Sequence, residues 1–114
     1  MSRGNRDKTV PLGRPLRVLV ADDDRDTVMN LGILLRSEGI EVQLARGGLK
    51  VPEAVAQFHP DAVLLDLAVS RHNGLDVAQE LTKRYGERCP VLIPLTKPYD
   101  PDALLKLVFS ITRK

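Results

Sequence analysis

Four short strand-like runs, separated by segments with helical spacing, constrain the fold of this chain more than any other feature. Three of them are apolar and rich in Val, Leu and Ile, which predicts buried strands, and they cover residues 17–21, 62–66 and a stretch that starts with 90–93. The other, residues 40–45, alternates apolar and polar side chains, which also predicts a strand. The intervening segments repeat apolar residues every three or four positions, which predicts helices. These helices are expected over residues 26–38, 52–58, 75–85 and 100–111.

The alternation of the two element types indicates the fold class. Strands that are apolar along their whole length and alternate with helices form parallel sheets covered on both faces. A chain of 114 residues has room for one core. We therefore expect a single α/β domain built on a doubly wound parallel sheet.

The positive charge of the chain is concentrated at its start. Residues 1–15 contain four basic residues and one acidic residue, whereas residues 16–114 contain 13 basic and 14 acidic residues. Pro11, Gly13 and Pro15 disfavour regular structure in the first segment. We expect a flexible basic leader over 1–15 and a folded domain over 16–114. A near-neutral domain in a chain with 4% aromatic residues gives no indication of nucleic-acid binding.

Cysteine content and hydropathy bear on the compartment. Cys89 is the single cysteine, so no disulfide can form within the chain. No apolar run approaches the roughly 20 residues that span a bilayer. The basic first nine residues are followed by no apolar segment of the kind that forms a secretory signal. These features favour a cytoplasmic protein without a membrane partner.

Chemically reactive side chains follow three of the four predicted strands. In a parallel α/β sheet, ligands bind beyond the carboxyl ends of the strands, where the strand order reverses. The candidates at these ends are Asp22, Asp23 and Asp24 after the first strand, Asp66 at the end of the third, and Thr96 and Lys97 after the fourth. We therefore expect acids, a hydroxyl and an ammonium group to converge on one crevice.

The acids carry the most specific chemical information in this set. Clustered carboxylates repel one another and remain ionised when a cation lies among them, and Mg²⁺ prefers oxygen ligands together with water. A carboxylate at the base of such a site can act as the nucleophile toward a phosphoryl group. Mg²⁺ and a lysine then neutralise charge on the transferred oxygens. Taken singly, each acid is equally explained as a helix N-cap, and Lys97 as a solvated surface residue.

Four segments resemble the receiver domain of two-component response regulators. They are RVLVADDD at 17–24, HPDAVLLDL at 59–67, NGL at 73–75 and KPYD at 97–100. The resemblance covers residues 16–114. It implies a receiver-like, flavodoxin-like sheet, truncated here to about four strands, in a phosphoacceptor that acts in two-component phosphorelay signalling.

The resemblance also implies roles by position. Asp66 matches the phosphoacceptor, whose carboxylate is also a metal ligand. Asp23 matches the acid that ligates Mg²⁺ directly, and Asp22 the acid that acts largely through water. The backbone carbonyl of Ala68 falls at the position of a further protein ligand. The implied cofactor is Mg²⁺, and the implied partner is a sensor histidine kinase or a phosphotransfer protein.

The sequence departs from the family pattern after the fourth strand. In the family a Ser or Thr ends that strand, and a further helix and strand precede the lysine. Here Thr96 and Lys97 are adjacent, so about 20 residues are missing at ordinary element lengths. Both residues are still expected to bind the phosphoryl group. Pro94 replaces the aromatic residue expected three positions before the lysine, so the usual switch and output face are expected to be incomplete.

The missing unit would leave the fourth strand at the edge of the sheet. We expect Val91, Leu92 and Ile93 to be exposed there. An exposed apolar edge invites pairing with another chain. The sequence therefore predicts a homodimer, formed either by pairing of this edge or by exchange of the last helix between subunits.

Three alternatives compete with a stand-alone phosphoacceptor, which would modify itself and turn over no external substrate. A pseudo-receiver that is never phosphorylated and serves as a dimerisation or interaction module is favoured by the missing unit and opposed by the retained acids and lysine. A phosphohydrolase of the haloacid-dehalogenase type requires Thr or Val where Asp26 stands. A calcium loop that begins at Asp22 fails because Thr27 and Ile33 occupy the positions that need glycine and glutamate.

Four further polar residues receive structural interpretations. His59 and His72 have no second ligand at helical spacing, so we expect solvated imidazoles. Cys89 precedes a strand and is expected to be a small buried residue. Arg25 lies beside the acids in sequence and is expected to offset their charge.

Overall fold

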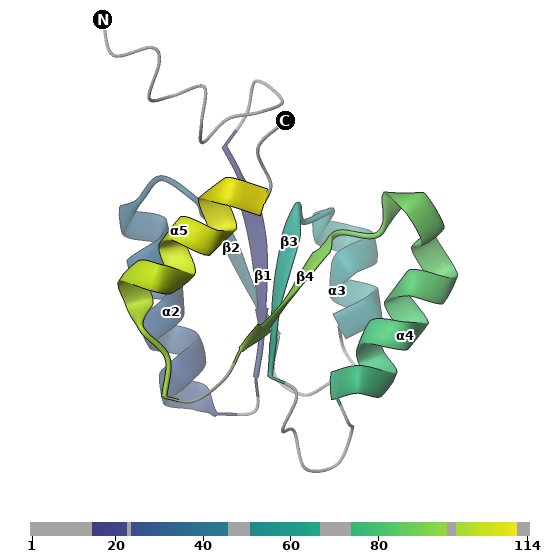
Figure 1. The fold of residues 1–114 in the computed structure, drawn as a ribbon, viewed down its shortest axis with the longest axis horizontal. Coiled ribbons are helices and arrows are strands. Elements are labelled where there is room, and N and C mark those ends of the chain that lie inside the picture. The colour runs from purple at the N-terminus through teal and green to yellow at the C-terminus, as the bar shows by residue number, and fades with distance from the viewer. Residues whose placement is uncertain (1–14, 23, 46–50, 67–73, 96–97, 112–114) are drawn as a thin grey trace, which may run out of the picture.

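The computed structural model (Figure 1) describes residues 15–22, 24–45, 51–66, 74–95 and 98–111. Strands and helices alternate along these segments, as the apolar periodicity predicts. The strands are β1 (Arg17–Ala21), β2 (Glu41–Ala45), β3 (Ala62–Asp66) and β4 (Val91–Leu95). The helices are α2 (Arg25–Ser37), α3 (Val51–Phe58), α4 (Gly74–Tyr85) and α5 (Pro101–Ile111), with a 3₁₀ turn, η2 (Gly86–Arg88), after α4.

The four strands form one parallel sheet in the order β2-β1-β3-β4. Helices α2 and α5 cover one face, and α3 and α4 cover the other (Figure 1). The predicted doubly wound, flavodoxin-like sheet of four strands is therefore confirmed. Within the described segments no strand pairs with the outer side of β4, which is an edge strand as predicted.

Each face of the sheet carries its own apolar core. Val18 and Val20 of β1 join the core beneath α2 and α5, whereas Leu19 and Ala21 join the core beneath α3 and α4. β3 alternates in the same way, and all five of its residues are buried. Burial on both faces explains why these two inner strands read as continuous apolar runs.

The fourth strand differs from the sequence-based expectation. It continues through Pro94 to Leu95. Of the three apolar residues expected to be exposed, Val91 is exposed, Leu92 is half-buried and Ile93 is buried. The prediction for Ile93 is wrong because α5 packs over this part of the sheet and takes its side chain into the core.

Several predictions concern residues at the periphery of the domain. His59 and Arg25 are exposed, and Cys89 is half-buried rather than buried. The leader predicted over 1–15 lies outside the described residues except for Pro15, and so does His72. None of the helices in the described segments is long and apolar enough to cross a membrane.

Candidate functional site

Asp22 and Asp66 occupy equivalent positions on the two inner strands. β1 and β3 pair in parallel up to Ala21 and Leu65, and each acid is the next residue along its own chain segment. Neighbouring strands lie about 4.8 Å apart. The register therefore brings the two residues to adjacent places at the carboxyl end of the sheet, where the sequence predicted them.

Both acids are removed from solvent. Asp22 is 1% exposed and Asp66 is 8% exposed, and they are the charged residues found buried within the described segments. Burial of a charge is costly unless a partner compensates for it. Two buried acids at adjacent positions are therefore better explained by a role in ligand binding than by a role in stabilising the hydrophobic core.

The backbone that follows β1 holds Asp22 in place. The N–H of Asp22 donates to the carbonyl oxygen of Ala45 on β2 at 3.2 Å. Oδ1 of Asp22 accepts the N–H of Asp24 at 3.0 Å. Asp24 in turn is the N-cap of α2, where its Oδ1 accepts the N–H of Asp26 at 3.1 Å and its Oδ2 accepts the hydroxyl of Thr27 at 2.8 Å. The first turn of α2 and the side chain of Asp22 are thus fixed by one chain of hydrogen bonds.

The end of β3 also meets the end of β4. Asp66 pairs with Leu95, the last residue of β4. The predicted phosphate-binding residues follow Leu95 directly in sequence. The predicted site residues that lie outside the described segments are Asp23, Ala68, Thr96 and Lys97. The structure brings Asp22 and Asp66 together, and the assignments of the other four residues stay predictions.

The two described acids suit a hard divalent cation. Carboxylate oxygens are ligands that Mg²⁺ prefers, and adjacent buried carboxylates repel each other unless a cation neutralises them. Within the described part of the chain, no group of three or more His, Cys, Asp or Glu side chains could hold a metal. A complete set of protein ligands therefore requires more than Asp22 and Asp66, and Asp23 and Ala68 remain the candidates.

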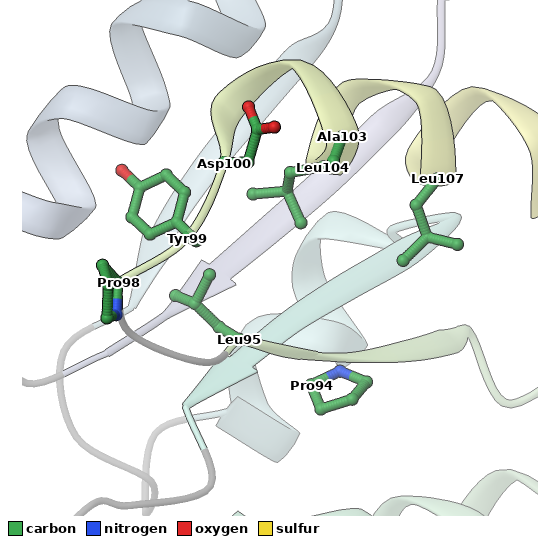
Figure 2. A pocket seen from close by; sticks show the side chains of 8 residues that line it. All are labelled: Pro94, Leu95, Pro98, Tyr99, Asp100, Ala103, Leu104 and Leu107. Carbon is green, nitrogen blue, oxygen red and sulfur yellow. The ribbon is translucent and has the colours of Figure 1, made fainter.

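Sequence reasoning named Asp24 among the acids after the first strand, with a helix N-cap as the alternative for each of them, and the structure makes Asp24 the N-cap of α2. It gave Tyr99 no role. Tyr99 is half-buried and packs against the core beneath α5. Figure 2 shows it near Leu95 in a groove between β4 and α5. Nothing in its neighbouring sequence indicated that packing.

A comparison with protein families identifies the family that has this fold. Residues 18–108 match the response regulator receiver domain. The chain belongs to the response regulator receiver family. The match runs from β1 into α5 and includes both buried acids, so this receiver domain is part of two-component signalling.

Two curated relatives illustrate how far the similarity extends. The receiver domain is 38% identical over 79 residues to the response regulator MprA of Mycobacterium sp. (strain KMS), covering 69% of this chain and 34% of that protein. It is 36% identical over 91 residues to the DNA-binding response regulator MtrA of Mycobacterium leprae (strain TN), covering 80% of this chain and 40% of that protein. The chain thus matches well under half the length of these relatives.

Solved structures share the fold over most of their length. The signal receiver domain of a response regulator from Bermanella marisrubri has a TM-score of 0.75 at 25% identity, covering 82% of this chain and 95% of that one. A CheY-like receiver domain from Methanospirillum hungatei JF-1 has a TM-score of 0.73 at 18% identity, covering 85% and 93%. The second likeness concerns the fold alone.

Proposed function

We propose that this receiver domain accepts a phosphoryl group on Asp66 from the phosphohistidine of a sensor histidine kinase or a phosphotransfer protein. The observation that carries the proposal is the buried pair of Asp22 and Asp66 at the carboxyl ends of adjacent strands. Ligands of open α/β sheets bind at that end. In a chain of this family, an acid at the end of β3 is therefore the natural nucleophile.

The proposed step is an exchange of one bond to phosphorus for another. A carboxylate oxygen of Asp66 attacks the phosphorus atom, a P–O bond forms, and the P–N bond of the donor phosphohistidine breaks. The leaving imidazole nitrogen takes a proton from solvent. The product is an acyl phosphate on Asp66, whose phosphoryl group carries a charge of about −1.5 to −2. Asp66 is 8% exposed, so its surroundings exclude most of the water that would compete with transfer.

The site at Asp66 is proposed to hold Mg²⁺. When bound, the metal neutralises charge on the oxygens of the transferred group. Asp22 and Asp23, with Asp66 and the carbonyl of Ala68, are the proposed ligands. Asp22 is already oriented before any ligand arrives, because Oδ1 accepts the N–H of Asp24 at 3.0 Å. The second oxygen of its carboxyl group is the one proposed to face the metal or its water.

Thr96 and Lys97 are proposed to bind the phosphoryl oxygens. The support is their place in the chain, one and two residues beyond Leu95, which pairs with Asp66. A strand advances about 3.3 Å per residue, so a separation of one or two residues from Leu95 in sequence is short. The long stem of a lysine adds to this reach.

The readout of phosphorylation is proposed to differ from that of other receivers. β4 is the last strand of the described sheet on its side, and Pro94 stands where an aromatic residue is expected. Both features support an output that does not use the usual switch. If the phosphorylation experiment described below is negative, the protein is instead inferred to be a pseudo-receiver that is never phosphorylated.

The wider assignments are proposals as well. We propose a cytoplasmic protein, supported by its family and its single cysteine. We propose self-modification without turnover of an external substrate, and no direct contact of residues 16–114 with nucleic acid, supported by their near-neutral charge. The homodimer is supported by the edge position of β4.

Intact-mass spectrometry tests the phosphoacceptor directly. The protein is incubated with Mg²⁺ and a small phosphodonor such as acetyl phosphate, alongside Asp66→Asn. Asp76→Asn is the matched control, because Asp76 is an exposed acid on α4. A parallel incubation with excess EDTA measures the dependence on metal.

We expect the mass of one phosphoryl group on the parent and on Asp76→Asn, and no gain on Asp66→Asn or in EDTA. No gain on a folded parent protein would sink the proposal and favour the pseudo-receiver. A gain that persists in Asp66→Asn would place the acceptor elsewhere.

A further inference from the structure

Asp24 lies between Asp22 and helix α2 in the chain and is bonded to both. Its backbone N–H donates to Oδ1 of Asp22 at 3.0 Å. Its side chain accepts the N–H of Asp26 at 3.1 Å and the hydroxyl of Thr27 at 2.8 Å. α2 begins at the carboxyl end of the sheet, beside the end of β1 (Figure 1). Asp24 therefore joins the first turn of the helix to a carboxylate of the candidate metal site.

The carboxylate of Asp24 is engaged by the helix and not by the site. Both of its oxygens accept hydrogen bonds from the first turn of α2, and Asp24 is exposed whereas Asp22 is buried. A side-chain oxygen that accepts a backbone N–H of the first turn is the usual arrangement of an N-cap. The contact of Asp24 with the site is made by its backbone, because its N–H is the group that reaches Asp22.

The cap fixes the position of this N–H. The carbonyl oxygen of Asp24 accepts the N–H of Val28 at 3.1 Å, and Val28 is buried in the core beneath α2. The backbone of Asp24 is thus anchored to a core residue, and its side chain is anchored to Asp26 and Thr27. The ends of helices fray, and an N-cap side chain opposes this. Loss of the cap would free the N–H of Asp24 to leave the carboxylate of Asp22.

We propose that Asp24 is a positioning residue for the magnesium site and acts through the cap of α2. A group that orients a metal ligand typically raises the affinity for the metal by roughly 10–100-fold. Oδ1 of Asp22 accepts the N–H of Asp24, and this bond sets the direction in which the carboxyl group presents its second oxygen. The inference rests on the proposed function, and it assigns part of the affinity for Mg²⁺ to a residue that is not itself a ligand.

A Mg²⁺ titration of the full chain tests this role. Amide NMR signals followed during addition of MgCl₂ give the dissociation constant at a temperature at which every variant is folded. We expect Asp24→Ala, which removes the cap, to raise this constant about tenfold. Asp24→Asn retains Oδ1 and is an equally good N-cap, so its constant should stay within about threefold of that of the parent protein.

Two further variants separate the cap from charge and from general stability. Thr27→Val removes the hydroxyl that donates to Oδ2 of Asp24 and leaves every acid in place, so it should weaken Mg²⁺ binding by a smaller factor. Asp100→Ala is the matched control, because Oδ1 of Asp100 accepts the N–H of Asp102 at 3.0 Å at the start of α5. This control should lower the melting temperature about as much as Asp24→Ala and leave the dissociation constant for Mg²⁺ unchanged.

Three results would overturn the inference. The first is an Asp24→Ala variant that binds Mg²⁺ as tightly as the parent protein. The second is an Asp24→Asn variant as weak as Asp24→Ala, which would assign the effect to the negative charge. The third is an equal weakening by Asp100→Ala, which would assign the effect to a general loss of stability.

The mass assay on the parent protein keeps this inference separate from the phosphoacceptor. A parent protein that gains the phosphoryl mass, while Asp24→Ala binds Mg²⁺ as tightly as it does, contradicts the positioning role alone. A parent protein that binds Mg²⁺ and gains no mass, while Asp24→Ala binds about tenfold more weakly, contradicts the phosphoacceptor alone. A parent protein that binds no Mg²⁺ overturns the metal site and the positioning role together.

Discussion

Arg17 and Asp61 bind each other in both directions at the amino end of β1 and β3. The N–H of Arg17 donates to Oδ2 of Asp61 at 2.9 Å, and the N–H of Asp61 donates to the carbonyl oxygen of Arg17 at 2.7 Å. Asp22 and Asp66 lie five residues further along the two segments. The reciprocal contact therefore fixes the register that brings the two acids together. A slip of one residue would turn every side chain of a strand to the other face.

Removal of the Asp61 carboxylate should loosen this register. We expect Asp61→Ala to lower the free energy of unfolding by about 1 kcal/mol, because the N–H of Arg17 loses its acceptor. Asp61→Asn retains an oxygen acceptor and should cost less than half as much. Urea denaturation measures both variants. Equal losses would show that the negative charge, and not the acceptor, is what stabilises this end of the sheet.

The acid pair should be a source of instability when metal is absent. Two like charges separated by about one strand spacing, roughly 5 Å, would repel by up to about 3 kcal/mol at an effective dielectric of 20. We expect Asp22→Asn to be more stable than the parent protein in EDTA by about 1 to 3 kcal/mol. Millimolar Mg²⁺ should stabilise the parent protein more than the variant. Thermal unfolding in both conditions checks this, with Asp76→Asn expected to show neither effect.

His59 has a left-handed backbone conformation, with φ of 54°. Its N–H donates to the carbonyl oxygen of Val55 at 2.9 Å, so it ends α3 as glycine often does. A side chain in this conformation costs about 1 kcal/mol relative to glycine. We expect His59→Gly to be more stable than His59→Ala by about this amount in urea denaturation. If the alanine variant is the more stable of the two, backbone strain does not govern this position.

The thiol of Cys89 should react slowly. Partial burial raises the pKa of Cys89 above 9.0, and a side-chain hydrogen bond with Thr82 opposes the shift. The folded protein therefore holds the thiol proton more tightly than the unfolded chain does. This contribution to stability is complete below pH 9.0 and is lost as the pH rises through the folded-state pKa.

Thiol labelling at several pH values checks the raised pKa. The folded protein should be labelled more slowly than the denatured chain below pH 9.0. Thr82→Val removes the opposing hydrogen bond and should slow labelling further. Faster labelling of this variant would show that opening of the structure, and not the pKa, controls the rate.

Pro94 should keep the edge of β4 from aggregating. Pro94→Val restores an outward N–H on an edge strand, and we expect faster growth of light scattering on storage at high concentration. Leu92→Val is the matched control, because it changes an outward residue of the same strand without adding a donor. Equal scattering from both variants would show that the missing N–H has no protective effect.

The inner strands and the acid pair were the most predictable parts of the molecule. Burial on both faces forces an unbroken apolar run, and such a run ends where Asp22 and Asp66 begin. Gly39, with φ of 81°, follows the end of α2, and a glycine directly after a helical segment is typical of a helix C-terminus. These features depend on one segment at a time, so the local sequence is enough to predict them.

Features that depend on contacts between distant segments could not be predicted from the local sequence. The burial of Ile93 follows from the way α5 packs over β4. The left-handed conformation of His59 and the 3₁₀ turn Gly86–Arg88 are set by how α3 and α4 connect to the next strands. The reciprocal contact of Arg17 with Asp61 joins residues 44 positions apart.

The two acids stand at the carboxyl ends of β1 and β3, away from the margin of the sheet. In the described sheet each of these strands has a neighbour on both sides, whereas β4 lies at the margin. An insertion or deletion beyond β4 would therefore reshape the border of the sheet without moving Asp22 relative to Asp66.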